Sequence, residues 1–136
     1  LKDRPFTMSG KIDAYIKHKD SFTIVDFKTT KINESKIDAY ATQLQSYALM
    51  MEKPKEGSLK LKPIKRLGIF CFEPNNILEA DGNNCNIHMN THWYDIPRDD
   101  KDLIGYITKI QDVLYSKETP ESGSSCGICN FRKVMK

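Results

Sequence analysis

Residues 10–30, GKIDAYIKHKDSFTIVDFKTT, decide the fold, because two apolar runs flank a short polar stretch there. The runs, residues 8–16 and 22–28, alternate in polarity and are rich in β-branched and aromatic side chains, a pattern typical of β-strands. The polar residues between them, KHKDS, favour a turn. We therefore predict a β-hairpin.

The register of this hairpin decides where its charges lie. A four-residue loop, HKDS, pairs Ala14 with Val25 and places Asp13 opposite Asp26. In that register Asp13, Asp26 and Lys28 share one face of the hairpin, and the other face is mostly apolar. A shift of one residue would separate the two acids.

Two facing carboxylates destabilise a strand pair unless one is protonated or a cation lies between them. Magnesium takes oxygen ligands, usually from one or two carboxylates together with water and phosphate. The hairpin residues alone leave two interpretations open, a divalent metal site or a solvated polar face.

After the hairpin the hydrophobic period changes from two to that of a helix. From about Asn33, a residue that favours a helix start, to Glu52, apolar side chains recur at spacings of three and four. This stripe consists of Ile37, Ala41, Leu44, Ala48 and Met51.

Two strands and a second helix are expected in the rest of the chain. Residues 64–72 are a near-continuous apolar run, as in an inner strand, and a crossover helix would allow it to lie parallel to a hairpin strand. Residues 73–84 are expected to form a loop and residues 86–96 a strand. Pro97, Asp99 and Asp100 favour the start of a helix with an apolar stripe of Leu103, Ile107, Ile110 and Leu114. The order ββαββα predicts an α/β (α+β) fold with a central mixed sheet.

Composition narrows the class of protein. The net charge of +3 permits a polyanionic partner without requiring one. No apolar run approaches the roughly 18 residues of a membrane helix, so no membrane partner is expected. The 4 cysteines are too few and too unevenly spaced for a secreted disulfide scaffold, which favours a cytoplasmic (intracellular) location.

Three short motifs occur in order: Gly10-x-x-Asp13, Asp26-x-Lys28 and Gln43-x-x-x-Tyr47. Together they resemble the RecB-like exonuclease branch of the PD-(D/E)XK nuclease superfamily. The resemblance implies a restriction-endonuclease-like core, with residues 1–117 as the nuclease-like domain. After Lys117 the composition turns to Ser, Gly, Pro and Glu, which predicts that residues 118–136 form a loop-like tail that contains CGIC.

The resemblance also implies roles for the motif residues in metal-assisted hydrolysis of DNA phosphodiester bonds, with Mg²⁺ or Mn²⁺ as the cofactor. Two acids would bind the metal with the help of one backbone carbonyl, and a lysine would polarise the attacking water and offset phosphate charge. A glutamine and a tyrosine would orient that lysine and contact DNA. In order, these residues are Asp13, Asp26, Phe27 (its carbonyl), Lys28, Gln43 and Tyr47.

DNA is thus the expected partner, in repair, recombination, phage or defence processing, together with a larger protein or complex to which this domain belongs. An alternative is a non-catalytic domain that binds DNA or protein, or a fragment that lacks part of the site. Many relatives carry a glutamate or histidine on a helix ahead of GxxD, and none of the residues before Gly10 matches it.

Two further sets of residues are weaker candidates. Lys60, Lys62, Lys65 and Arg66 are either a DNA-binding segment or a solvated loop. Cys126 and Cys129 match the first two cysteines of the branch's iron–sulfur spacing C-x-x-C-x-x-x-x-x-C, but Met135 occupies the last position. An iron–sulfur cluster held by this chain alone is not expected. The pair is a relic, half of a site completed elsewhere, or two ordinary loop cysteines.

Overall fold

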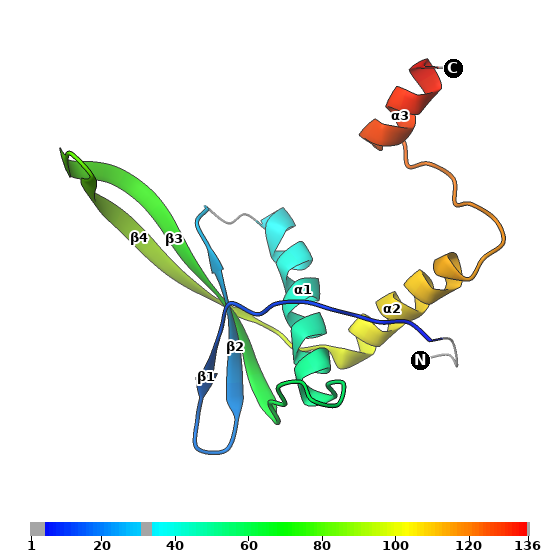
Figure 1. The fold of residues 1–136 in the computed structure, drawn as a ribbon, viewed down its shortest axis with the longest axis horizontal. Coiled ribbons are helices and arrows are strands. Elements are labelled where there is room, and N and C mark those ends of the chain that lie inside the picture. The colour runs from blue at the N-terminus through cyan, green and yellow to red at the C-terminus, as the bar shows by residue number, and fades with distance from the viewer. Residues whose placement is uncertain (1–4, 31–33, 136) are drawn as a thin grey trace. The chain divides into compact units, whose positions relative to one another are not determined.

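The computed structural model describes residues 5–30 and 34–135. Its elements follow in the order β1 (Ala14–Lys17), β2 (Phe22–Lys28), α1 (Glu34–Glu52), β3 (Ile64–Asp81), β4 (Asn84–Ile96), α2 (Asp100–Leu114) and α3 (Gly127–Val134) (Figure 1). The strands form a 4-stranded mixed sheet in the order β1-β2-β3-β4. The predicted α+β class and the order ββαββα are confirmed, and α3 follows them.

The chain divides into two compact units. One unit is Thr7–Leu103, which contains the whole sheet and α1, and the other combines the residues up to Phe6 with those from Ile104 on. Compact units need not coincide with functional domains, so the division into residues 1–117 and 118–136 stays a prediction. All three motifs lie within Thr7–Leu103.

The β1–β2 hairpin has the predicted register. Ala14 pairs with Val25 and Lys17 with Phe22, so the loop is HKDS, closed by a 2.8 Å hydrogen bond from His18 N to Ser21 O. The predicted first strand was too long, because β1 includes only Ala14–Lys17 of residues 8–16. Residues 7–13 are not paired with β2 as a strand. At residue 13 the side chain, instead of the backbone, bonds to β2.

A parallel pairing places β3 beside β2, with α1 as the crossover. The buried apolar side chains of α1, Leu44 and Ala48, pack with Ile24 of β2 and Ile69 of β3 in one core cluster. The predicted stripe of α1 is thus confirmed, since Ile37, Ala41 and Met51 also pack against this cluster. The start of the helix at Asn33 lies outside the described residues.

The prediction of a loop at residues 73–84 is wrong. β3 continues to Asp81 and forms a long antiparallel hairpin with β4 (Figure 1), closed by a tight turn at Gly82, whose φ is +52°. The pairing of β3 with β2 ends at Cys71, so the rest of β3 is not paired with β2 on that edge. Proline is tolerated on an unpaired edge of a sheet. Register irregularities around Pro74 and Ile77 accommodate the turn-forming residues within the strand.

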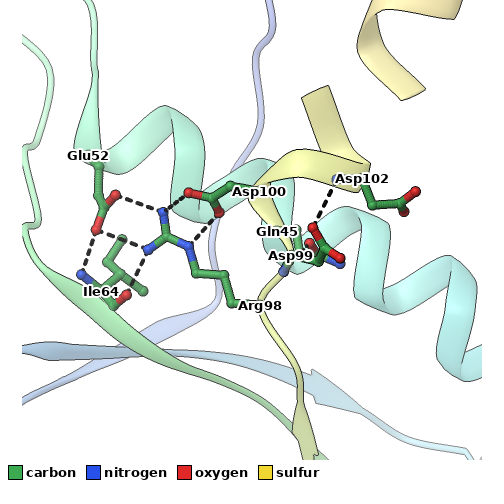
Figure 2. Close-up of polar contacts among 7 residues, drawn as sticks. All are labelled: Gln45, Glu52, Ile64, Arg98, Asp99, Asp100 and Asp102. Carbon is green, nitrogen blue, oxygen red and sulfur yellow. Dashed lines mark hydrogen bonds and ion pairs between the residues drawn. The ribbon is translucent and has the colours of Figure 1, made fainter. Parts of the chain in front are cut away.

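An ion-pair cluster joins the end of α1 to the start of β3 (Figure 2). Arg98 donates to Glu52 Oε1 and Oε2 at 3.0 and 2.8 Å, to Ile64 O at 2.7 Å, and to both oxygens of Asp100 at 2.6 and 2.7 Å. Glu52 Oε1 also accepts the Ile64 N–H at 2.7 Å. These bonds set where β3 begins, and therefore its register beside β2.

The start of α2 is fixed by Asp99, whose Oδ1 accepts the Asp102 N–H at 2.9 Å, while its own N–H donates to Gln45 Oε1 at 2.9 Å (Figure 2). Such a cap satisfies a helix N–H that has no partner within the helix. The predicted apolar stripe of α2 is only partly right, because Ile110 and Leu114 are exposed.

The prediction that the tail is loop-like is only partly right, because α3 occupies Gly127–Val134, directly after Cys126. None of the helices in the described parts of the chain combines the length and the apolar character needed to cross a bilayer.

Candidate functional site

The acid and the lysine of the second motif lie on the face of β2 that is covered by α1. Ile24, Asp26 and Lys28 alternate along β2, so they project to the same side, and Ile24 belongs to the core cluster with Leu44 of α1. In the parallel register Asp26 pairs with Ile69 and Lys28 with Cys71. The site therefore lies between the carboxyl end of β2 and the helix.

Asp26 is a buried acid, with 3% of its surface exposed. Its Oδ2 lies 2.5 Å from Lys28 Nζ, and among the described residues no donor makes a well-aligned hydrogen bond to this oxygen. Burial alone would lower the pKa of Lys28, but the close contact with the Asp26 carboxylate and its negative charge outweigh burial, so that this pKa is raised. Lys28 is thus a cation at neutral pH.

Asp13 directly precedes β1 and bridges the hairpin through its side chain. Its Oδ2 accepts the Phe27 N–H at 2.9 Å, which takes the place of a backbone bond where β1 has not yet begun. Asp13 also helps to raise the pKa of Lys28, so its charge lies within electrostatic range of that ammonium. The structure therefore brings both acids and the lysine of the motifs to one end of the hairpin.

The glutamine and tyrosine of the third motif meet each other and the first motif. Gln43 Nε2 donates to Tyr47 Oη at 2.7 Å. A Cβ atom on Gly10 would lie only 2.6 Å from Tyr47 Cε1, so the tyrosine ring occupies the space that any side chain at this position would need. Only glycine allows Tyr47 to pack here, three residues ahead of Asp13.

Two residues that the motifs did not indicate lie beside Lys28. Its Nζ is 4.6 Å from the ring centre of Tyr40, and Cys71 is its partner on β3. Burial raises the pKa of the Cys71 thiol, as does Asp26, while Lys28 opposes the shift. Tyr40 precedes Gln43 by one helical turn, so helical periodicity offered a signal for it. Cys71 offered none, because its place depends on strand register.

The basic candidates lie at the opposite end of β2 from the acids. Arg66 pairs with Thr23, whereas Ile69 pairs with Asp26, and three strand residues span roughly 10 Å. The side chain of Arg66 donates to Asp95 Oδ1 at 2.7 Å. The lysines of this segment, Lys60, Lys62 and Lys65, are exposed. A role for these residues in DNA binding stays a prediction.

The cysteine pair lies at the start of α3, in the other compact unit. The backbone N–H and the thiol of Cys129 bond to Cys126 and lower its pKa, and the same thiol contact raises the pKa of Cys129. Residues 5–30 and 34–135 contain no group of three or more His, Cys, Asp or Glu side chains placed to bind a metal ion together.

The hairpin acids nevertheless suit a partial site for a divalent cation. The Lys28 ammonium faces the buried Oδ2 of Asp26, and the exposed Asp13 carboxylate uses its Oδ2 to accept the Phe27 N–H. Mg²⁺ is commonly bound by one or two carboxylates, with water and substrate phosphate in its other positions. The two acids match that donor set, and a phosphate ligand would complete it.

The sequence model of the PD-(D/E)XK nuclease superfamily matches residues 2–134. The chain belongs to this superfamily. The matched range includes all three motifs, and the mixed sheet with its helices is consistent with the restriction-endonuclease-like fold of PD-(D/E)XK proteins. No curated protein and no solved structure matches the chain.

Membership of the PD-(D/E)XK superfamily gives the motif geometry a chemical context. Its members are generally nucleases, which hydrolyse nucleic acids, and they typically use divalent metals. An acid pair with an adjacent charged lysine, at the end of a strand, is an arrangement that can bind a cation and a phosphate at the same time.

Proposed function

We propose that this protein is a divalent-metal-dependent deoxyribonuclease of the RecB-like type, acting as an exonuclease. The observation that carries the proposal is the buried Asp26, whose Oδ2 has Lys28 as its close neighbour while Asp13 bonds to the next peptide. A fold kept only for binding has no need of two acids and a lysine at one strand end. The link to exonucleases, and to repair, recombination, phage or defence processing, rests on the motif resemblance.

In this proposal Asp13 and Asp26 hold a Mg²⁺ or Mn²⁺ ion, with the Phe27 carbonyl nearby. The ion would stabilise negative charge on the phosphate during hydrolysis. Lys28, which is positively charged, offsets charge on the same phosphate and orients the attacking water. Gln43 and Tyr47 hold the start of the Gly10–Asp13 segment against α1, which fixes the first acid.

The test compares the wild type with Asp26→Asn in calorimetric titration with Mn²⁺ and in cleavage of linear single-stranded, linear double-stranded and circular DNA. We expect Asp26→Asn to lose Mn²⁺ binding and to cut at least about a hundredfold more slowly, because metal assistance contributes several kcal/mol. Asp20→Asn, in the loop of the same hairpin, is the matched control and should behave like the wild type. Cleavage of circular DNA as fast as linear DNA would contradict the exonuclease assignment.

A second candidate function is a non-catalytic nuclease-fold domain that binds DNA or protein. It is favoured by the ion pair itself, because Lys28 already neutralises Asp26 without a metal. Undiminished cleavage by Asp26→Asn would refute our site, whereas DNA binding without Mn²⁺ binding or cleavage in the wild type would establish the second candidate.

A further inference from the structure

Among the described residues, side chains of two different elements lie close to the ammonium of Lys28. Asp26, from the same strand, lies 2.5 Å from Nζ, and the ring centre of Tyr40, from α1, lies 4.6 Å from it. A cation within about 6 Å of an aromatic centre is attracted by the negative ring face. The helix therefore contributes directly to the placement of the lysine.

The ring of Tyr40 is fixed, whereas a lysine side chain is not. Tyr40 packs against the core cluster that contains Leu44 and Ile69. A lysine has a flexible four-carbon stem and loses rotamer entropy when it is held in one conformation. Cys71 pairs with Lys28 in the register and is buried, so β3 closes the side of the site away from β1.

We propose that Tyr40 is a positioning residue for the nuclease reaction, because its ring face holds the Lys28 ammonium beside Asp26. This inference rests on the proposed function and gives Tyr40 no contact with substrate. Misplacement of a reacting group by about 1 Å can lower a rate about a hundredfold, so the lysine requires more support than a single ion pair. Among the described residues, the aromatic ring facing the Lys28 ammonium is that of Tyr40, and the ring of the motif tyrosine, Tyr47, packs at Gly10.

A tyrosine that only fills space would affect stability alone. A positioning role predicts three further results: the ring is needed and the hydroxyl is not, kcat changes while KM for DNA does not, and the lysine itself moves when the ring is removed.

The experiment compares Tyr40→Phe and Tyr40→Leu with the wild type, and Tyr106→Leu, a half-exposed helical tyrosine outside the site, is the control. Steady-state cleavage of linear DNA with Mn²⁺ gives kcat and KM. NMR of the Lys28 side chain, assigned with Lys28→Met, reports the upfield ring-current shift of its εCH₂ protons. Circular dichroism confirms that each variant is folded at the assay temperature.

We expect Tyr40→Phe to retain the upfield shift and a kcat within about twofold of the wild type. Tyr40→Leu should lose the shift and lower kcat about tenfold at unchanged KM, and Tyr106→Leu should change neither.

Loss of the shift in a folded Tyr40→Leu variant with unchanged kcat would overturn the proposal, and so would an equal loss of kcat in Tyr40→Phe and Tyr40→Leu. A wild type without any cleavage would refute the proposed function instead. The Lys28 shift, and its loss in Tyr40→Leu, would still show whether the ring holds the lysine.

Discussion

Replacement of Arg98 by methionine tests how much the cluster in Figure 2 stabilises the sheet. Methionine keeps much of the apolar stem but removes the donors to Glu52 and to Ile64 O. Glu52, with 13% of its side chain exposed, would remain charged and would keep the Ile64 N–H from this cluster. Breaking a buried ion pair costs about 3–5 kcal/mol, and because 20% of the Arg98 side chain is exposed, we expect the lower end, about 3 kcal/mol.

The assay is urea unfolding followed by far-ultraviolet circular dichroism. Arg66→Met is the matched control, because its ion pair to Asp95 has a similar length, 2.7 Å against 2.8 Å for Arg98 and Glu52, but 55% and 62% of the two side chains are exposed. Screening by water should make this second substitution nearly neutral. A loss in Arg98→Met no larger than that in Arg66→Met would refute the reasoning, because burial would then not determine the strength of these pairs.

Three further results are expected. Arg98 lowers the pKa of Glu52, so the pair stabilises the folded state above the unfolded pKa of about 4.3. This contribution is lost as the pH falls through the lower pKa of the folded state. The free energy of unfolding of Glu52→Gln should therefore depend less on pH between about 5 and 3 than that of the wild type. In Gly68→Ala the new Cβ would lie 2.0 Å from Trp93 Cζ2, so the free energy of unfolding in urea should fall by about 3 kcal/mol. Adding Trp93→Leu should restore part of this loss. If the effects of the two substitutions simply add in the double variant, the clash is contradicted. In Gly10→Ala the new Cβ would lie 2.6 Å from the Tyr47 ring, so the free energy of unfolding should fall by about 1–3 kcal/mol and DNA cleavage should slow. When Tyr47→Leu is already present, adding Gly10→Ala should cause neither effect.

The hairpin and its acids were predictable because local rules determine them. A four-residue polar loop fixes the register of two alternating strands, so the placement of Asp13 near Asp26 followed from the sequence alone. The crossover helix was equally predictable, since the apolar stripe and the length expected from the sequence agree with those of α1. These predictions needed no information about contacts distant in the sequence.

The long hairpin of β3 and β4 could not be predicted in the same way. Pro74 and the asparagines after it signal a turn, and the strand tolerates them only because β2 ends at the level of Cys71 and leaves that edge of β3 unpaired. Similarly, β1 is short because the Asp13 side chain, and not a backbone carbonyl, accepts the Phe27 N–H. Both outcomes depend on contacts between strands, which no local pattern encodes.

Within the candidate site, the sequence placed the motif residues near one another but did not indicate all their neighbours. The resemblance implies that Gln43 and Tyr47 orient the lysine, which stays a prediction, and the structure adds the ring of Tyr40 beside Lys28. Which of two tyrosines on one helix face meets the lysine depends on how α1 is placed along β2. That placement is set by packing of the core cluster and cannot be read from helical spacing.

The contact between Gly10 and Tyr47 has an evolutionary consequence. Because a ring carbon occupies the space of a Cβ atom, neither position can change freely while the other is kept. In homologous chains the two positions should vary together, with a larger residue at the first accompanied by a smaller one at the second. A lineage in which one of these two residues is replaced should soon replace the other, even though the glycine and the tyrosine belong to different motifs.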